Sequence, residues 1–164
     1  MNIKKIYDAS VLINILEDLD FPEIMVLWNQ NPRYEQWITS EINNEIKRLA
    51  RKKLDELINQ EIIKIFDPVP QDKLDEIEID YPKLSQPDCS LYYYCMQLND
   101  CICLTNDKPL RDYLELNNLR KFGTYGIYNK LKKDNSFPLK DIESKFAILK
   151  KDPRVFPANF KENP

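Results

Sequence analysis

Residues 101–107 read CICLTND, and this short stretch decides the fold. A run of apolar residues is followed at once by Thr105, Asn106 and Asp107, and a charged, helix-like segment begins after them. Such a run is typical of a buried strand in a parallel sheet. The carboxyl ends of parallel strands form a crevice where ligands bind, so we expect Asp107 to face a site. Capping of the next helix is the alternative role for this acid.

Strand and helix patterns alternate along the rest of the chain. This order predicts an α/β fold, a three-layer α/β/α sandwich with a mainly parallel sheet. We expect one domain over residues 1–150, followed by a proline-rich tail, 151–164, that is loosely ordered. The expected strands lie within residues 4–8, 36–40, 61–69, 101–107 and 120–126, and the expected helices within 10–17, 22–30, 41–60, 72–84, 87–100, 109–117, 126–133 and 139–151.

Composition narrows the class of protein. The chain has 164 residues, of which 43% are apolar and 31% charged, with a mean hydropathy of -0.56, as in ordinary water-soluble domains. No apolar run approaches the roughly 20 residues of a membrane span, and residues 1–10 lack the pattern of a signal peptide. We therefore expect a cytoplasmic protein without a membrane partner.

Missing residue types exclude several mechanisms. The chain has no histidine, which removes Ser-His-Asp and Cys-His nucleophilic systems, and only two glycines, too few for a Rossmann or P-loop phosphate cradle. The cysteines lack paired C-x-x-C spacing, so we interpret Cys89, Cys95, Cys101 and Cys103 as small, buried and reduced.

Carboxylates recur at the expected strand ends and first helical turns. Asp8 ends the first strand, Glu41 and Glu45 follow the second, Asp88 opens the helix before the fourth strand, and Asp107 follows that strand. Each alone is also explained as a cap or a solvated acid. Clustered carboxylates repel one another unless a cation lies between them, and their hard oxygens suit Mg²⁺ or Mn²⁺. The shared location therefore predicts a metal site suited to phosphodiester hydrolysis.

Four segments resemble PIN-domain proteins, a family that includes metal-dependent ribonucleases such as VapC-type toxins. They are YDASVLINIL (7–16), ITSEINNEIKRL (38–49), LSQPDCSLYYYCMQLNDCICLTNDKPLRDYLE (84–115) and FGTYGIYNKLKK (122–133). The resemblance covers roughly residues 3–133. It implies a cytoplasmic Mg²⁺- or Mn²⁺-dependent endoribonuclease acting on single-stranded RNA. It also suggests a toxin of a toxin–antitoxin pair, restrained by an antitoxin protein and often a homodimer.

The resemblance assigns an acidic quartet of Asp8, Glu45, Asp88 and Asp107. The three aspartates would hold the metal, and Glu45 would hold a second ion or orient water. Glu45 matches the family pattern because Ile42 precedes it by three residues and Ile46 follows it, while Glu41 is the fallback.

Supporting residues are also implied. Ser10, Thr105 and Asn106 resemble polar groups that orient acids or water, although Ser10 could instead be an N-cap and Thr105 a buried strand residue.

The net charge of -3 and the pI near 5.2 are unusual for a protein that binds RNA. Phosphate affinity would have to come from the metal and from a local strip comprising Lys47, Arg48, Lys108 and Arg111, which could instead be a solvated helix face.

Two other function classes stay open. One is a non-catalytic PIN-like module that binds RNA or a protein partner. The other is a metal-dependent phosphatase or receiver-like domain, but YDAS lacks the second aspartate of a D-x-D nucleophile motif.

Overall fold

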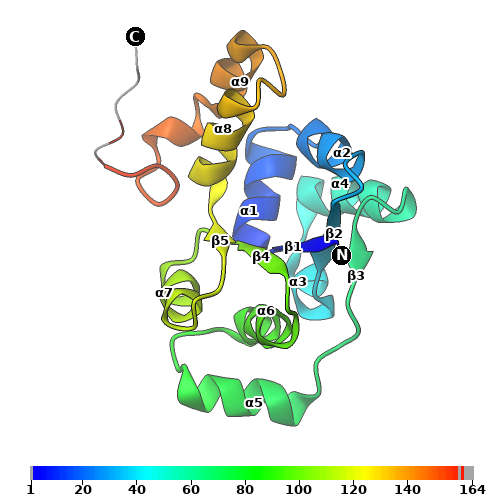
Figure 1. The fold of residues 1–164 in the computed structure, drawn as a ribbon, viewed down its shortest axis with the longest axis vertical. Coiled ribbons are helices and arrows are strands. Elements are labelled where there is room, and N and C mark those ends of the chain that lie inside the picture. The colour runs from blue at the N-terminus through cyan, green and yellow to red at the C-terminus, as the bar shows by residue number, and fades with distance from the viewer. Residues whose placement is uncertain (1, 159, 161–164) are drawn as a thin grey trace.

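A parallel sheet forms the centre of the molecule (Figure 1). The computed structural model describes residues 2–158 and 160, and within them the sheet has five strands in the order β3-β2-β1-β4-β5. All four strand pairs are parallel, as expected from buried runs such as CICL. The strands are β1 (Ile3–Tyr7), β2 (Tyr34–Ile38), β3 (Lys64–Ile65), β4 (Cys101–Leu104) and β5 (Lys121–Phe122).

Helices cover both faces of this sheet and complete a three-layer α/β/α sandwich. In Figure 1, α6 and α7 lie on one side, with α5 outside them, and α1, α2 and α8 lie on the other. The helices are α1 (Ala9–Ile13), which continues as a π-helical turn (Asn14–Asp18), α2 (Glu23–Asn29), α3 (Ser40–Glu45), α4 (Arg48–Asn59), α5 (Gln71–Asp80), α6 (Gln86–Gln97), α7 (Lys108–Leu116), α8 (Thr124–Lys133) and α9 (Leu139–Phe146), followed by a 3-10 turn (Leu149–Lys151).

The strand order brings the ends of β1 and β4 together. These strands are neighbours, with Tyr7 opposite Leu104. The Asp8 N–H donates to the Leu104 carbonyl at 2.8 Å, which continues the ladder one residue beyond β1. Because β2 and β4 lie on opposite sides of β1, the chain reverses its order here. Ligands of open α/β sheets bind at such a switch point.

The core is continuous and mostly aliphatic. Cys89, Cys95, Cys101 and Cys103 are buried free thiols, which confirms the prediction that they are reduced. One hydrophobic cluster extends from Ile6 to Phe156 along the chain. It packs both faces of the sheet and fixes the edge at which the acids lie.

The helix expected over residues 41–60 is interrupted. Ile46 and Lys47 are extended, and Arg48 has a φ of 58°, in the left-handed region. Ile42 and Ile46 are buried, whereas Leu49 is 47% exposed because α4 starts in a new direction. The break ends α3 at Glu45.

Part of the expected loose tail is packed. Phe156 is 2% exposed, and its ring lies 5.1 Å from the Tyr125 ring and 5.3 Å from the Tyr128 ring, both on α8. Phe156 therefore holds part of the expected loose tail against α8, while residues 159 and 161–164 lie outside the described residues. Among the described helices, none combines the length and apolar character needed to cross a membrane.

Candidate active site

Asp8 lies directly after β1 and is the N-cap of α1, since its Oδ1 accepts a hydrogen bond of 2.7 Å from the Ala9 N–H. Its Oδ2 accepts bonds of 2.7 Å from the hydroxyls of Ser10 and Thr105. The residue is 4% exposed, and burial raises the pKa of its carboxyl, against the opposing effect of these hydrogen bonds. Three donors therefore fix the carboxylate, and Ser10 supports Asp8 instead of acting as the N-cap.

Asp107 follows β4 and caps α7, because its Oδ2 accepts a hydrogen bond of 2.9 Å from the Leu110 N–H. The Asp107 N–H donates to Thr105 Oγ1 at 3.0 Å, so one buried hydroxyl links Asp107 to Asp8. Within the described part of the chain, Asp107 Oδ1 has no hydrogen-bond partner. Asp107 thus caps a helix and also presents a free carboxylate oxygen.

Asp88 lies in the first turn of α6 and forms a capping box with Ser85. The Asp88 N–H donates to Ser85 Oγ at 3.3 Å, and the Ser85 N–H donates to Asp88 Oδ2 at 3.2 Å. Burial raises the pKa of Asp88 to about 6, with further contributions from the charges of Asp8 and Asp107. The charges of both strand-end acids therefore contribute to the raised pKa of Asp88.

Glu45 and Glu41, the preferred and the fallback candidate for the fourth acid, lie in different surroundings. Glu45, the last residue of α3, lines the same cavity as Asp8, and burial followed by the charge of Asp8 raises its pKa. Glu41 does not line this cavity: its Oε1 accepts a hydrogen bond of 3.0 Å from the Val69 N–H, in the segment before α5. The position of Glu45 agrees with the preferred assignment, and that of Glu41 does not agree with the fallback.

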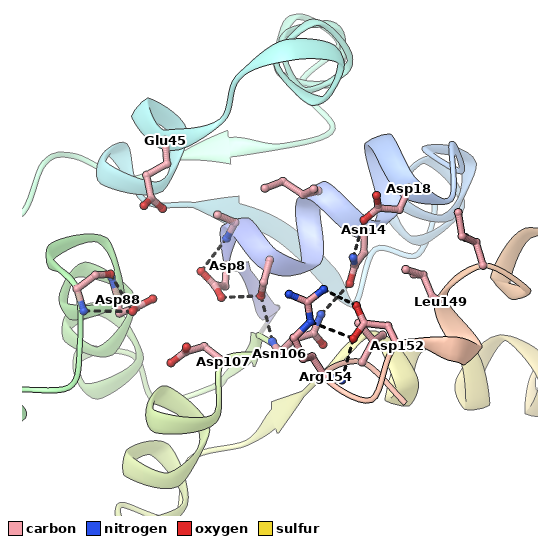
Figure 2. Close-up of a pocket in the computed structure, with 16 residues that line it drawn as sticks. Asp8, Asn14, Asp18, Glu45, Asp88, Asn106, Asp107, Leu149, Asp152 and Arg154 are labelled. Atoms are coloured by element: carbon pink, nitrogen blue, oxygen red, sulfur yellow. Dashed lines mark hydrogen bonds and ion pairs between the residues drawn. The ribbon is translucent and has the colours of Figure 1, made fainter. Parts of the chain in front are cut away.

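The four acids converge on one open cavity of about 680 Å³, the acid pocket (Figure 2). In Figure 2, Glu45 extends from α3 toward Asp8, and Asp88 and Asp107 face the same space from α6 and the end of β4. Of the described residues that line the pocket, Arg154 is the sole cation, and its guanidinium pairs with Asp152 at 2.8 Å. The four carboxylates of the quartet therefore share the pocket, and no described cation forms an ion pair with them.

A hydrogen-bonded amide network supports the floor of the acid pocket. The Asn106 N–H donates to Ser10 Oγ at 3.1 Å, and Asn106 Nδ2 donates to Asn14 Oδ1 at 2.8 Å and to Thr124 Oγ1 at 2.9 Å. Asn14 Nδ2 in turn donates to Asp18 Oδ2 at 2.8 Å. Asn106 therefore joins α1 to α8 beside the acids.

Asn14, Thr124 and Asp18 were missed from the sequence. Asn14 is separated along the chain from Asn106 by 92 residues and from Thr124 by 110. The one available signal was an asparagine among the apolar residues of VLINIL, in the helix that follows the first acid.

The predicted RNA-binding cations do not form one strip. Lys108 and Arg111 line a second groove of about 1040 Å³, the side groove, which shares Asn106, Asp107, Arg154 and Val155 with the acid pocket. Lys108 pairs with Asp112 at 2.6 Å, and Arg111 donates to the Thr105 carbonyl at 3.3 Å. Lys47 and Arg48 are exposed after Glu45 and line neither cavity.

The donor set fits a hydrated divalent metal. Among the described residues, no group of three or more Asp, Glu, Cys or His side chains could hold a metal ion as it stands. Mg²⁺, however, keeps several waters and takes only one or two carboxylates directly. Asp107 Oδ1 has no protein donor, and Asp8, Asp88 and Glu45 face it across the pocket in an uncompensated cluster of hard oxygens. These residues fit Mg²⁺ or Mn²⁺ bound largely through water.

Comparison with protein-family models and with curated proteins gives no match to this sequence. Among solved structures, the chain is similar to PAE2754 from Pyrobaculum aerophilum, with 18% identity and a TM-score of 0.47, over 67% of this chain and 84% of that chain.

Proposed function

We propose that this chain is a Mg²⁺- or Mn²⁺-dependent endoribonuclease that hydrolyses phosphodiester bonds of single-stranded RNA. The observation that carries the proposal is the convergence of Asp8, Glu45, Asp88 and Asp107, from four elements, on a pocket in which the quartet has no cation. Like charges in a shared site raise the pKa of one another and destabilise the fold, unless a bound cation reverses the effect. Helix capping explains Asp8, Asp88 and Asp107 one by one, but it does not explain the pocket that they share with Glu45.

Asp8, Asp88 and Asp107 would hold the metal. When bound, a divalent ion supplies a Lewis acid that favours attack of water on a phosphodiester and stabilises the charge that develops there. Asp8 is held in place by three donors, so it is the preorganised ligand, whereas Asp88 is fixed through one carboxylate oxygen by Ser85.

Glu45, the fourth acid of the quartet, would have a different role from the three aspartates that hold the metal. It makes no hydrogen bond or ion pair within the described residues, and burial and the charge of Asp8 raise its pKa. A carboxylate of raised pKa is a better proton acceptor. Glu45 would orient the attacking water and accept its proton, or hold a second ion.

The residues that line the side groove favour a single-stranded RNA as the substrate. It joins the acid pocket at Asp107 and carries Lys108 and Arg111 together with the rings of Phe122 and Tyr125. Cations attract phosphates, and the exposed ring of Phe122 can stack on an unpaired base. Lys47 and Arg48 would contact the strand beyond Glu45, on the far side of the acids.

The test is cleavage of a pool of structured and single-stranded RNAs by wild type, Asp88→Asn and Asp72→Asn. Each reaction is run with Mg²⁺ or Mn²⁺ and with EDTA. Asp72 is an exposed acid in the first turn of α5, outside the acid pocket, and is the matched control. We expect metal-dependent cleavage by wild type and Asp72→Asn and none by Asp88→Asn, with folding of each variant checked by circular dichroism.

Equal cleavage by wild type and Asp88→Asn would mean a contaminant and would refute the mechanism. RNA binding without cleavage would favour the non-catalytic PIN-like module. The finer role of a toxin rests on the sequence resemblance, and an adjacent short reading frame for a DNA-binding protein would support it.

A further inference from the structure

A buried lysine without a hydrogen-bond partner lies outside the acid pocket. Lys5, in the middle of β1, is 4% exposed, and its Nζ makes no hydrogen bond to any described residue. Leaving a buried donor without a partner destabilises the folded protein. A lysine is rarely buried without a partner, so this side chain needs an explanation beyond packing.

Two rings stabilise the Lys5 amine only in part. Nζ lies 3.4 Å from the centre of the Trp28 ring and 4.2 Å from that of Tyr34, and such cation–π contacts favour the charged form. Burial, and then the charge of Lys130, lower the pKa of Lys5 to about 7, while Asp134 opposes this change. Neither ring accepts a conventional hydrogen bond, so the N–H donors of Lys5 remain available.

Lys5 lines a cavity of about 200 Å³ between the sheet, α2 and α8, here called the amine pocket. Lys130 is the other charged lining residue, and the rest of the lining is uncharged: Trp28, Tyr34, Ile102, Leu104, Phe122, Gly126 and Ile127. The amine pocket shares none of these residues with the acid pocket. An apolar cavity of about 150 Å³ accommodates a benzene ring, so the volume here suits a ring with a small polar group.

We propose that the amine pocket binds a small carboxylic acid with an apolar, ring-sized body. The carboxylate would accept hydrogen bonds from Lys5 and face Lys130, and the body would pack against Trp28 and the aliphatic lining. A neutral apolar ligand would leave Lys5 unpaired, and a cationic one would meet two cations. No carboxylate lines the pocket to compete, and the nearby Asp134 is paired with Lys130 at 2.7 Å. This inference does not depend on the acid pocket, although Phe122 and Gly126 line both the amine pocket and the side groove.

The first test compares benzoate, benzyl alcohol and benzylammonium as probes of the wild-type protein at pH 7, by calorimetry and by the NMR signals of the Trp28 ring. We expect benzoate to shift these signals, benzyl alcohol to bind at least about tenfold more weakly (about 1.4 kcal/mol), and benzylammonium not to bind.

Proton uptake gives an independent readout. The charged or titratable groups that face Lys5 are Tyr34 of β2 and Lys130 and Asp134 of α8, while α2 contributes the uncharged Trp28. Because a bound carboxylate favours the protonated amine, the heat of benzoate binding should differ between two buffers of different ionisation enthalpy.

The second test uses Lys5→Met, which removes the amine and keeps an unbranched side chain one atom shorter. Lys133→Met, at an exposed position on α8 outside the pocket, is the matched control. Benzoate affinity should fall at least about tenfold in the first variant and stay unchanged in the second. Absence of a Trp28 shift with benzoate, equal binding of benzyl alcohol, or full binding by Lys5→Met would overturn the proposal. If Lys5→Met does not fold, the ranking of the three probes on wild type decides the question alone.

Discussion

Thr105 is the residue on which both strand-end acids depend. Its hydroxyl donates to Asp8 Oδ2 at 2.7 Å and accepts from the Asp107 N–H at 3.0 Å. Thr105→Val removes both bonds and leaves the Asp107 N–H without that partner, so the free energy of unfolding should fall by about 1–3 kcal/mol. RNA cleavage should fall as well, because Asp8 loses one of the donors that orient it. Urea denaturation and the cleavage assay measure the two effects.

Thr105→Ser is the control for that substitution, because it keeps the hydroxyl and removes only the methyl group. If serine and valine lowered stability and cleavage alike, packing of the methyl group and not the hydrogen bonds would be responsible.

Lys5 gives a prediction about pH and stability. Its pKa is lowered from 10.5 to about 7 in the folded protein. Between those values the unfolded chain binds the proton and the folded protein does not, so this residue makes stability rise with pH. Below pH 7 Lys5 is protonated in both states, so the unfavourable burial of its charge lowers the stability of the folded protein by its full amount. Lys5→Met should therefore be more stable than wild type by on the order of 3 kcal/mol near pH 6, and the advantage should shrink toward pH 10.

Urea denaturation of both proteins from pH 6 to pH 10 measures this difference, and other titrating groups cancel in the comparison. An advantage of Lys5→Met that does not change with pH would show that Lys5 keeps an ordinary pKa in the folded protein.

At the scale of elements, the turn from β5 into α8 is packed against the end of β4. A Cβ on Gly123 would lie 2.7 Å from Asn106 Oδ1, 2.7 Å from Arg111 Nη1 and 3.3 Å from the Thr105 carbonyl. Asn106 cannot move freely, since it is hydrogen-bonded to α1 and α8. Gly123→Ala should therefore cost about 1–3 kcal/mol of stability and disturb the acid pocket.

Gly126→Ala is the matched control for Gly123→Ala, since Gly123 and Gly126 are the two glycines of the chain. Its Cβ would lie 2.6 Å from Phe122 Cδ1, but that side chain is 44% exposed and can rotate away. Alanine also favours a helix over glycine by roughly 0.5–1 kcal/mol, so the net change should be small. Thermal denaturation compares the two variants, and an equal loss in both would contradict the assigned role of Asn106.

Elements were predictable from the sequence where local chemistry decides them. The β4 run CICL is apolar on both faces, and Asp8, Asp88 and Asp107 begin helices in ways that capping chemistry indicates. The segment 41–60 could be predicted to continue or re-form as a helix, but the position of the break was not predictable, because Arg48 adopts a φ of 58° without a glycine or proline to signal it. The sequence pattern preferred Glu45 to Glu41, but the contact that turns Glu41 toward Val69 required the tertiary structure.

Contacts between residues that are far apart along the chain could not be predicted from the sequence either. Asn14 and Thr124 lie 110 residues apart, and helix periodicity does not tell which polar side chains will meet. Leu149, Asp152 and Arg154 form a wall of the acid pocket, and the local sequence around them does not indicate that they lie near the acids. Local patterns therefore located the acids, while the residues that hold them required the tertiary structure.

At the scale of the whole molecule, the net charge of -3 conceals an uneven distribution. The acids of the quartet face the acid pocket, whereas Lys108, Arg111 and Lys121 line the adjoining side groove. An acidic pI is therefore compatible with a local surface that attracts phosphate. Salt should weaken binding through the side groove, since contacts between cations and phosphates are screened.

Metal binding should stabilise the whole fold. Without metal, the pKa of Asp88, raised from 3.8 to about 6, makes stability fall as pH rises through that interval, because the folded protein holds the proton more tightly. At pH 7, Mn²⁺ at about 100 times its Kd should add about 2.7 kcal/mol, or roughly 5–10 °C in Tm. The shift should shrink at pH 5, where Asp88 is protonated, and should be lost in Asp88→Asn but kept in Asp72→Asn. Calorimetric scans with Mn²⁺, and with NaCl at matched ionic strength, test this. An equal Mn²⁺ shift in wild type and Asp88→Asn, or one that NaCl reproduces, would place the ion outside the acid pocket.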